Sequence, residues 1–252
     1  IMQIAENKIL ELKIPVQVKK DVVSFCKELV NVFPDTLVCG YIYGAAVKDE
    51  FIESVSAVNI LVVLNNLDME KIEKIAEKAK AYHSNSSIVP RFLMEKNVVT
   101  GLDVFALDYY IIKKEGLLIF GKDIFASHAI EEKHIVFQLE RDTKAMRMKI
   151  LQSFWRNSDQ LPAMRKILFT NLRQLLVNLR VMLDIKKVPY NTQEDVVTQA
   201  GKMVGFSSDI LVNLLNARKE KKQLTKNEMS LYIRDIFNVI AKMDDYFDEW
   251  NK

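Results

Sequence analysis

Apolar residues in the first part of the chain follow two spacings, one typical of helices and one typical of buried strands. Residues 18–33 carry them at helical spacing, which predicts an amphipathic helix. Residues 36–47 are rich in Val, Ile, Leu and Tyr and include Gly44, which predicts a strand that runs into a turn. Residues 58–64 form a nearly continuous apolar run, as expected of a strand buried on both faces.

The same alternation of helix and strand patterns continues to about residue 130. Asp68 can cap the start of a second helix. Further strands are expected over residues 88–93, 104–110 and 117–120. The first part of the chain therefore predicts an α/β domain, residues 1–130, in which helices flank a small mixed β-sheet.

From residue 131 onward no strand pattern follows, and long amphipathic helical runs replace it. Thr192 with Asp195, and Thr225 with Glu228, have the spacing of a box in which a hydroxyl and a carboxylate cap the start of a helix. Short connections between such helices predict an antiparallel bundle over residues 131–252. The fold class expected for the whole chain is α+β, with a mixed sheet followed by an all-α bundle.

Composition and charge exclude several classes of protein. With 49% hydrophobic residues the 252-residue chain can bury a sizeable core, and its net charge of +3 is too small to demand a nucleic-acid partner. It has no run of about 18 apolar residues that would span a membrane. Without a visible secretory signal, the cytoplasm is the expected location. Cys26 and Cys39 lie in apolar surroundings and are expected to be small buried side chains.

Two segments in order along the chain carry a resemblance to a known superfamily. The stretch 41–46, Tyr-Ile-Tyr-Gly-Ala-Ala, and the apolar stretch 56–64 resemble the DNA polymerase beta-like nucleotidyltransferases, in particular the minimal and kanamycin-type members. In that family a strand ends in Gly-Ser, and about a dozen residues later two aspartates, one residue apart, lie on an apolar strand. Residues 103–109 and 118–123 also look like later family segments, with a third acid on a neighbouring strand.

The chemistry of the family depends on those residues. A hydroxyl attacks the α-phosphate of a nucleoside triphosphate, and two Mg²⁺ ions hold the attacking and leaving oxygens. Aspartates at positions i and i+2 of a strand point to the same face, so both can reach the ions. Mg²⁺ needs hard oxygen ligands such as these carboxylates.

This chain departs from the pattern at each position. Ala45 stands where the resemblance places the serine, and Ala57 and Asn59 stand where it places the paired aspartates. Alanine cannot bind a metal, and asparagine offers an oxygen without charge. Asp108, with Asp103 as rival, is the candidate for the third acid, and Gly44 retains the turn.

Other candidate sites are weaker. His83, His128 and His134 lack metal-ligand spacing, so no zinc or other metal site is expected. Basic residues are frequent between Arg141 and Lys187. Three arginines there have a spacing that can place them on one helix flank, where they could bind an anion: Arg165, Arg173 and Arg180.

These observations favour a catalytically degenerate nucleotidyltransferase-fold protein with a binding or regulatory role. Its candidate ligand-binding residues are Gly44, Ala45, Asn59, Asp108, Arg165 and Arg173. The expected partners are a nucleotide or another anionic small molecule, a protein, or a second copy in a dimer. No cofactor is expected.

Two alternatives remain open. The first is an active nucleotidyltransferase that uses Mg²⁺ at a non-standard site, with Asp108 and an acid from the loop after the turn: Asp49, Glu50 or Glu53. The second is a nucleic-acid-associated module that uses the basic helical face.

Overall fold

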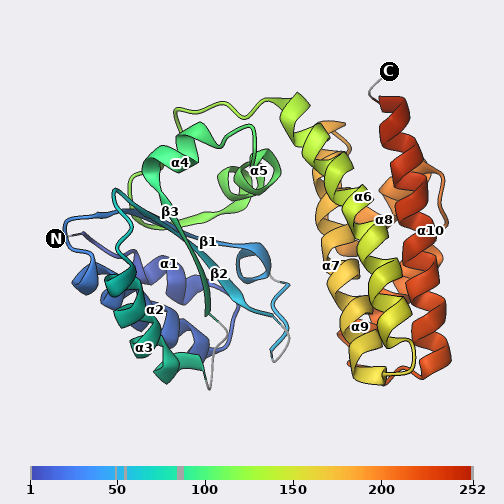
Figure 1. Ribbon diagram of the computed structural model, residues 1–252, viewed down its shortest axis with the longest axis horizontal. Helices are drawn as coiled ribbons and strands as arrows, with labels where there is room; N and C mark the ends of the chain where they lie inside the picture. The colour runs from blue at the N-terminus through green and yellow to red at the C-terminus, as the bar shows by residue number, and fades with distance from the viewer. Residues whose placement is uncertain (1, 49, 54–55, 84–87, 251–252) are drawn as a thin grey trace. The chain divides into compact units, whose positions relative to one another are not determined.

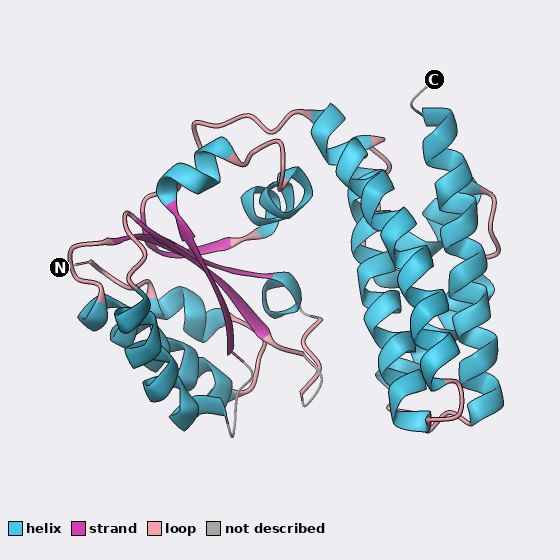
Figure 2. Cartoon of the chain, viewed as in Figure 1, coloured by secondary structure: helices cyan, strands magenta, loops and turns pink. Residues whose placement is uncertain are grey.

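The computed structural model describes residues 2–48, 50–53, 56–83 and 88–250. The chain divides into two compact units, residues 1–131 and residues 132–252 (Figure 1). The described part of the second unit is helical, whereas the first unit combines helices with a sheet (Figure 2). The expected α+β class is confirmed.

The sheet of the first unit has four strands in the order β3-β2-β1-β4. Their bounds are Leu37–Tyr43 for β1, Val58–Leu64 for β2, Ile88–Met94 for β3 and Leu117–Gly121 for β4. Strand β1 runs antiparallel to β2 and β4, and β2 runs parallel to β3, so the sheet is mixed. Because β2 lies inside the sheet and is covered on both faces, its seven residues are almost all apolar, as the sequence predicted.

Helices cover both faces of this sheet (Figure 1). One face packs against α1 (Glu6–Glu11), α2 (Val16–Val32) and α3 (Met69–His83), with Phe25 and Leu29 of α2 fully buried there. The other face packs against α4 (Glu95–Thr100) and α5 (Ala106–Glu115). Along β2 the pleat directs alternate residues to the two cores, with Ile60 and Val62 on one face and Leu61 and Val63 on the other.

The two cysteines occupy both cores. Cys26 lies in α2 and Cys39 in β1; both are buried, free thiols. Burial raises the pKa of each thiol to about 12, so both are expected to be protonated and unreactive at neutral pH.

The strand expected over residues 104–110 is wrong, because this segment is a turn followed by helix α5. The buried side chains of Tyr109 and Ile112, three residues apart, lie on one helical face and pack against the sheet. A short apolar run does not distinguish a strand from a buried helix. The short helices α1 and α4 were also not predicted.

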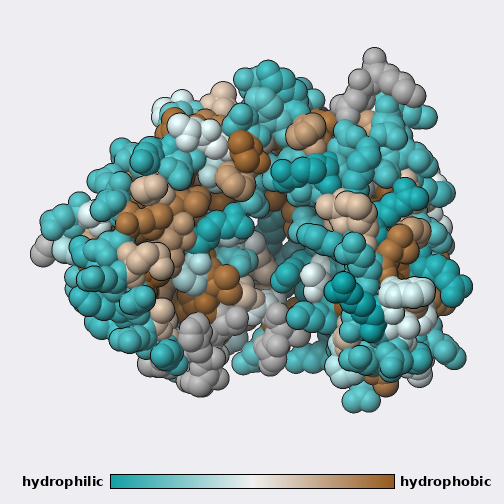
Figure 3. All heavy atoms as spheres, in the orientation of Figure 1, coloured by the Kyte–Doolittle hydropathy of each residue, from teal (hydrophilic) through white to brown (hydrophobic). Residues whose placement is uncertain are grey.

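The second unit contains five described helices: α6 (Glu132–Asn157), α7 (Leu161–Ile185), α8 (Gln193–Val204), α9 (Asp209–Lys219) and α10 (Lys226–Trp250). Helices α6, α7 and α10 pack against one another around apolar side chains such as Leu139, Leu172 and Ile240. The face of this unit seen in Figure 3 is mostly hydrophilic. In the described part of the chain, no helix combines the length and the apolarity needed to cross a membrane.

Candidate functional site

The turn after β1 brings Gly44 beside Asn59. Tyr43, the last residue of β1, pairs with Asn59 at the start of β2. Gly44 has a φ of +81°, in the left-handed region that favours glycine, and begins the short 3₁₀ helix η1 (Gly44–Val47). A Cβ atom at Gly44 would lie 3.1 Å from Nδ2 of Asn59. The fold therefore joins two of the residues that the sequence singled out.

Asn59 lies on the sheet face that α5 covers. The strand alternation places it on the side of Leu61 and Val63, which are buried against α5. Ala57 lies one residue before β2, two residues from Asn59, and is partly buried. The pair Ala57 and Asn59 therefore supplies one amide and no carboxylate at the edge of this face.

The strand beside β2 carries a positive charge on the same face. Strand β3 reads Ile-Val-Pro-Arg-Phe-Leu-Met and has no acid. Its Val89 pairs with Asn59 and its Arg91 with Leu61, so Arg91 lies diagonally beside Asn59. The resemblance had implied a third acid on a neighbouring strand, and the nearest charged residue on β3 is instead a cation.

Asp108 meets this arginine from helix α5, not from a strand. Arg91 donates a hydrogen bond of 2.8 Å from Nη1 to Oδ2 of Asp108. The two side chains are 44% and 38% exposed, so solutes can reach both of them. Asp108 thus lies near the face that carries Asn59, but its charge is balanced by Arg91.

The ion pair of Arg91 and Asp108 affects the pKa of two neighbouring tyrosines. Burial raises the pKa of Tyr43, Arg91 opposes that rise, and Asp108 adds to it. Tyr109 behaves in the same way. Burial lowers the pKa of Arg91, but Asp108, together with Tyr43 and Tyr109, more than offsets this, so the net shift is upward and the guanidinium stays charged.

A second ion pair ties the other end of α5 to the loop after η1. Lys48 pairs with Glu115, and both side chains are 19% exposed. Each of these two acids of α5, seven residues apart, therefore pairs with a cation, Asp108 with Arg91 of β3 and Glu115 with Lys48. Because both acids of α5 are already ion-paired, neither is readily available to a divalent ion.

The remaining acidic candidates do not complete a metal site in the described part of the chain. Asp49 lies outside the described residues, and Glu53 is exposed. Glu50 is partly buried, and its backbone N–H donates to the carbonyl of Ala45. Asp103 is exposed and accepts from the backbone N–H of Val104. Across the described residues, no group of three His, Cys, Asp or Glu side chains is placed to hold a metal ion.

The arginines of α7 belong to the second unit. Arg165 and Arg173 are exposed, and the guanidinium of Arg165 lies over the ring of Phe169 at 5.0 Å. Arg180 is buried within the bundle, so the three arginines do not form one exposed flank. Residue 128 contributes a backbone carbonyl that accepts from Lys113. The side chain of His83 lies outside the described part of the structure.

Arg91 is the residue that sequence reasoning missed. The apolar pattern predicted the strand that carries Arg91 but gave this residue no role. The strand nevertheless contains one feature that could have drawn attention to Arg91. Arg91 is the only charged residue among seven and lies between Val89 and Leu93 on the alternation that faces α5. A charged side chain on a mostly apolar face indicates a polar partner in the element that covers that face.

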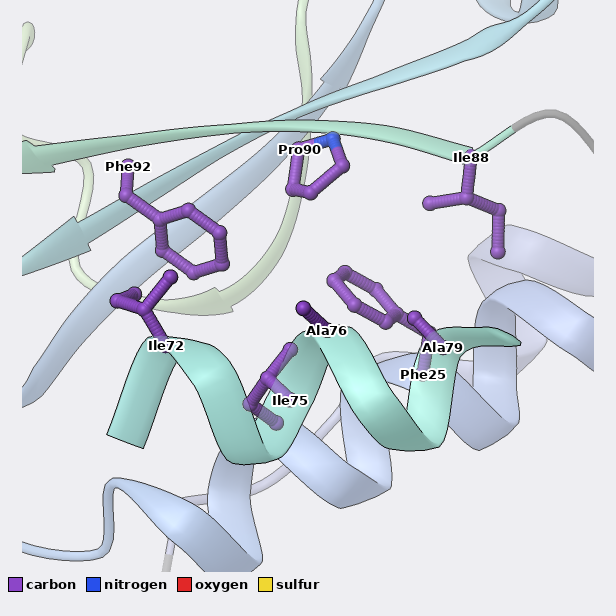
Figure 4. A pocket seen from close by; sticks show the side chains of 8 residues that line it. All are labelled: Phe25, Ile72, Ile75, Ala76, Ala79, Ile88, Pro90 and Phe92. Carbon is purple, nitrogen blue, oxygen red and sulfur yellow. The ribbon is translucent and has the colours of Figure 1, made fainter. Parts of the chain in front are cut away.

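The first unit also contains an apolar cavity on its opposite face. It measures about 110 Å³ and lies between α3 and β3 (Figure 4). Its lining side chains are all apolar: Phe25, Ile72, Ile75, Ala76, Ala79, Ile88, Pro90 and Phe92. Such a lining offers no group for polar chemistry, so the cavity is separate from the candidate site.

Comparison with known proteins identifies the fold. Neither a protein-family profile nor a curated protein matches the sequence significantly. Among solved structures, the chain is similar to spectinomycin adenyltransferase AAD(9) from Enterococcus faecialis, determined with ATP and spectinomycin. The TM-score is 0.58 at 13% identity, over 88% of this chain and 98% of that chain. The chain therefore has a nucleotidyltransferase fold.

Proposed function

We propose that this protein is a catalytically degenerate member of the nucleotidyltransferase fold that binds a small anionic ligand, in a regulatory or sensing role. One observation supports this proposal most strongly. At the sheet face where the family needs carboxylates, this chain has Ala57, Asn59 and the cation Arg91, and its remaining acid, Asp108, is paired with that cation.

The charge balance opposes catalysis by two metal ions. Two Mg²⁺ ions beside a triphosphate need several carboxylates to offset their mutual repulsion and to fix their geometry. An arginine on the same face repels both ions. Asp108 would have to leave Arg91 to bind one of them.

Binding of an anion needs neither metal nor carboxylates. The turn at Gly44 and the cation Arg91 remain, and the similar solved structure holds ATP. A nucleotide or another phosphorylated small molecule is therefore the ligand class that we propose for this chain. On the second unit, the exposed Arg165 and Arg173 are separate candidates for binding an anion.

A transfer assay tests the loss of catalysis. The protein is incubated with α-labelled nucleoside triphosphates, Mg²⁺ or Mn²⁺, and protein, RNA and aminoglycoside acceptors. We expect no label on any acceptor. Steady transfer that disappears in Asp108→Ala would refute the proposal and favour an active enzyme that uses Asp108 with Glu50 or Glu53.

A further inference from the structure

We propose that Arg91 binds a phosphate group of the ligand directly and without metal, and that Asp108 occupies the guanidinium until the ligand displaces it. This inference rests on the proposed function, because it names the ligand chemistry of the same site. In this proposal Asp108 does not bind a metal ion. Its carboxylate instead competes with the phosphate group for Arg91.

The geometry presents Arg91 to a ligand. Its side chain extends from β3 on the face that carries Asn59, and 44% of it is exposed. Its hydrogen bond to Asp108 leaves from Nη1, whereas a guanidinium carries five N–H donors in a planar fork. Arginine matches the oxygens of a phosphate group with two parallel donors.

The tie to Asp108 is weak enough to exchange. Ion pairs at this exposure contribute little to stability, because water screens them. A phosphate group offers more charge and more acceptor oxygens than one carboxylate, so it can displace Asp108. Until then Asp108 keeps the guanidinium oriented over the sheet.

Neighbouring groups suit an anion better than a cation. Tyr43 lies close enough to Arg91 and Asp108 for both to change its pKa, and its hydroxyl stays protonated and able to donate. Gly44 follows directly and presents no Cβ atom at the turn. No carboxylate lies on β3 to repel an anion.

Titration calorimetry in the presence of a chelator tests the assignment, with inorganic phosphate and ATP as separate probes. Phosphate binding that is lost in Arg91→Gln, and weakened in Arg91→Lys, is the expected result. Asp108→Asn removes the competing carboxylate, so we expect phosphate to bind more tightly by up to about fivefold, on the scale of one exposed ion pair. Tighter binding of ATP than of phosphate would show that the site recognises more of ATP than one phosphate group.

Matched controls come from another exposed ion pair of the same unit. Lys27 and Glu6 lie 2.9 Å apart on α2 and α1, at 55% and 44% exposure. Lys27→Gln and Glu6→Gln should leave phosphate binding unchanged.

The assignment is wrong if Arg91→Gln binds phosphate as well as the natural protein, or if Asp108→Asn weakens binding. Transfer of label with phosphate binding still dependent on Arg91 would refute the proposed function alone. If neither label transfer nor phosphate binding that depends on Arg91 is found, the assignment of Arg91 is wrong and the proposed loss of catalysis stands.

Discussion

The hydroxyl of Tyr41 donates a 2.8 Å hydrogen bond to Oδ1 of Asp123, which lies 82 residues further along the chain. The backbone N–H of Ile124 donates to the same hydroxyl at 3.0 Å, and that of Phe125 donates to Asp123 at 2.9 Å. Strand β1 is thereby fastened to the segment that follows β4. This contact gives a structural role to Asp123, in the segment 118–123 that resembled the end of the family's domain.

Tyr41→Phe removes the hydroxyl and leaves the buried N–H of Ile124 without its acceptor. An unsatisfied buried donor costs about 1–3 kcal/mol, so we expect the free energy of unfolding to fall by that amount. Urea denaturation followed by circular dichroism measures it. Tyr232→Phe on α10 is the control, because that phenol takes no part in this network, and it should change stability by less than about 0.5 kcal/mol. Equal effects of the two variants would contradict the role of the hydrogen bond.

Local patterns in the sequence predicted most of the elements. Strand β2 has the predicted bounds, 58–64, because an apolar run of strand length is a local signal. The cap at Thr192 is confirmed, since its side chain and that of Asp195 bond each other's backbone N–H groups. Both features depend on residues within a few positions of one another.

Contacts between residues far apart in the sequence were harder to predict. Arg91 reaches the site only because β3 runs parallel to β2 in one register, and no local pattern encodes that register. Asp108 was assigned to a strand because seven residues of mixed apolar character fit either element. Residues 44, 57 and 59 were brought forward by the resemblance to a family rather than by periodicity.

The apolar cavity between α3 and β3 predicts a stabilising substitution. Ala79→Leu places additional carbon atoms in a space of about 110 Å³ lined by apolar side chains. Cavity filling commonly stabilises by about 0.5–2 kcal/mol, and we expect a rise of that size in the free energy of unfolding. Lys80→Leu, at the exposed neighbouring position, is the control and should bring no such gain. A loss of stability in Ala79→Leu would mean that the cavity cannot admit the larger side chain.

The cap at the start of α10 predicts a dependence of bundle stability on pH. The backbone N–H of Thr225 donates to Glu228, and its hydroxyl and Lys222 also contribute, which together lower the pKa of Glu228 to about 2 from 4.5. A carboxyl whose folded pKa is depressed stabilises the fold above its unfolded pKa. That contribution is lost as pH falls from 4.5 toward 2.

Glu228→Gln should therefore lower the melting temperature at pH 6, and the gap to the natural protein should close below the unfolded pKa. Differential scanning calorimetry across this pH range measures the gap. Glu220→Gln, at an exposed position in the preceding turn, is the control and should track the natural protein. A gap that stays constant down to pH 2 would show that the carboxylate charge does not supply the cap.

The last prediction concerns the lost metal site. Ala57→Asp with Asn59→Asp restores the two carboxylates, but Arg91 would remain on the same face and pair with one of them. The double variant should then gain little from Mg²⁺. Adding Arg91→Asp removes that cation and leaves acids that repel one another until a divalent ion binds. We expect this triple variant alone to gain Mg²⁺-dependent thermal stability, by about 2.7 kcal/mol when Mg²⁺ exceeds its dissociation constant a hundredfold.

The control replaces the same three positions by asparagine, which keeps side-chain size and removes charge: Ala57→Asn and Arg91→Asn beside the natural Asn59. It should show no response to Mg²⁺. A double variant that responds as strongly as the triple would place Arg91 away from the restored carboxylates. If the triple variant gains nothing, the three positions do not share one site and the correspondence with the family's aspartates is wrong. If the natural protein itself gains stability from Mg²⁺, a working metal site exists and the degenerate interpretation is refuted.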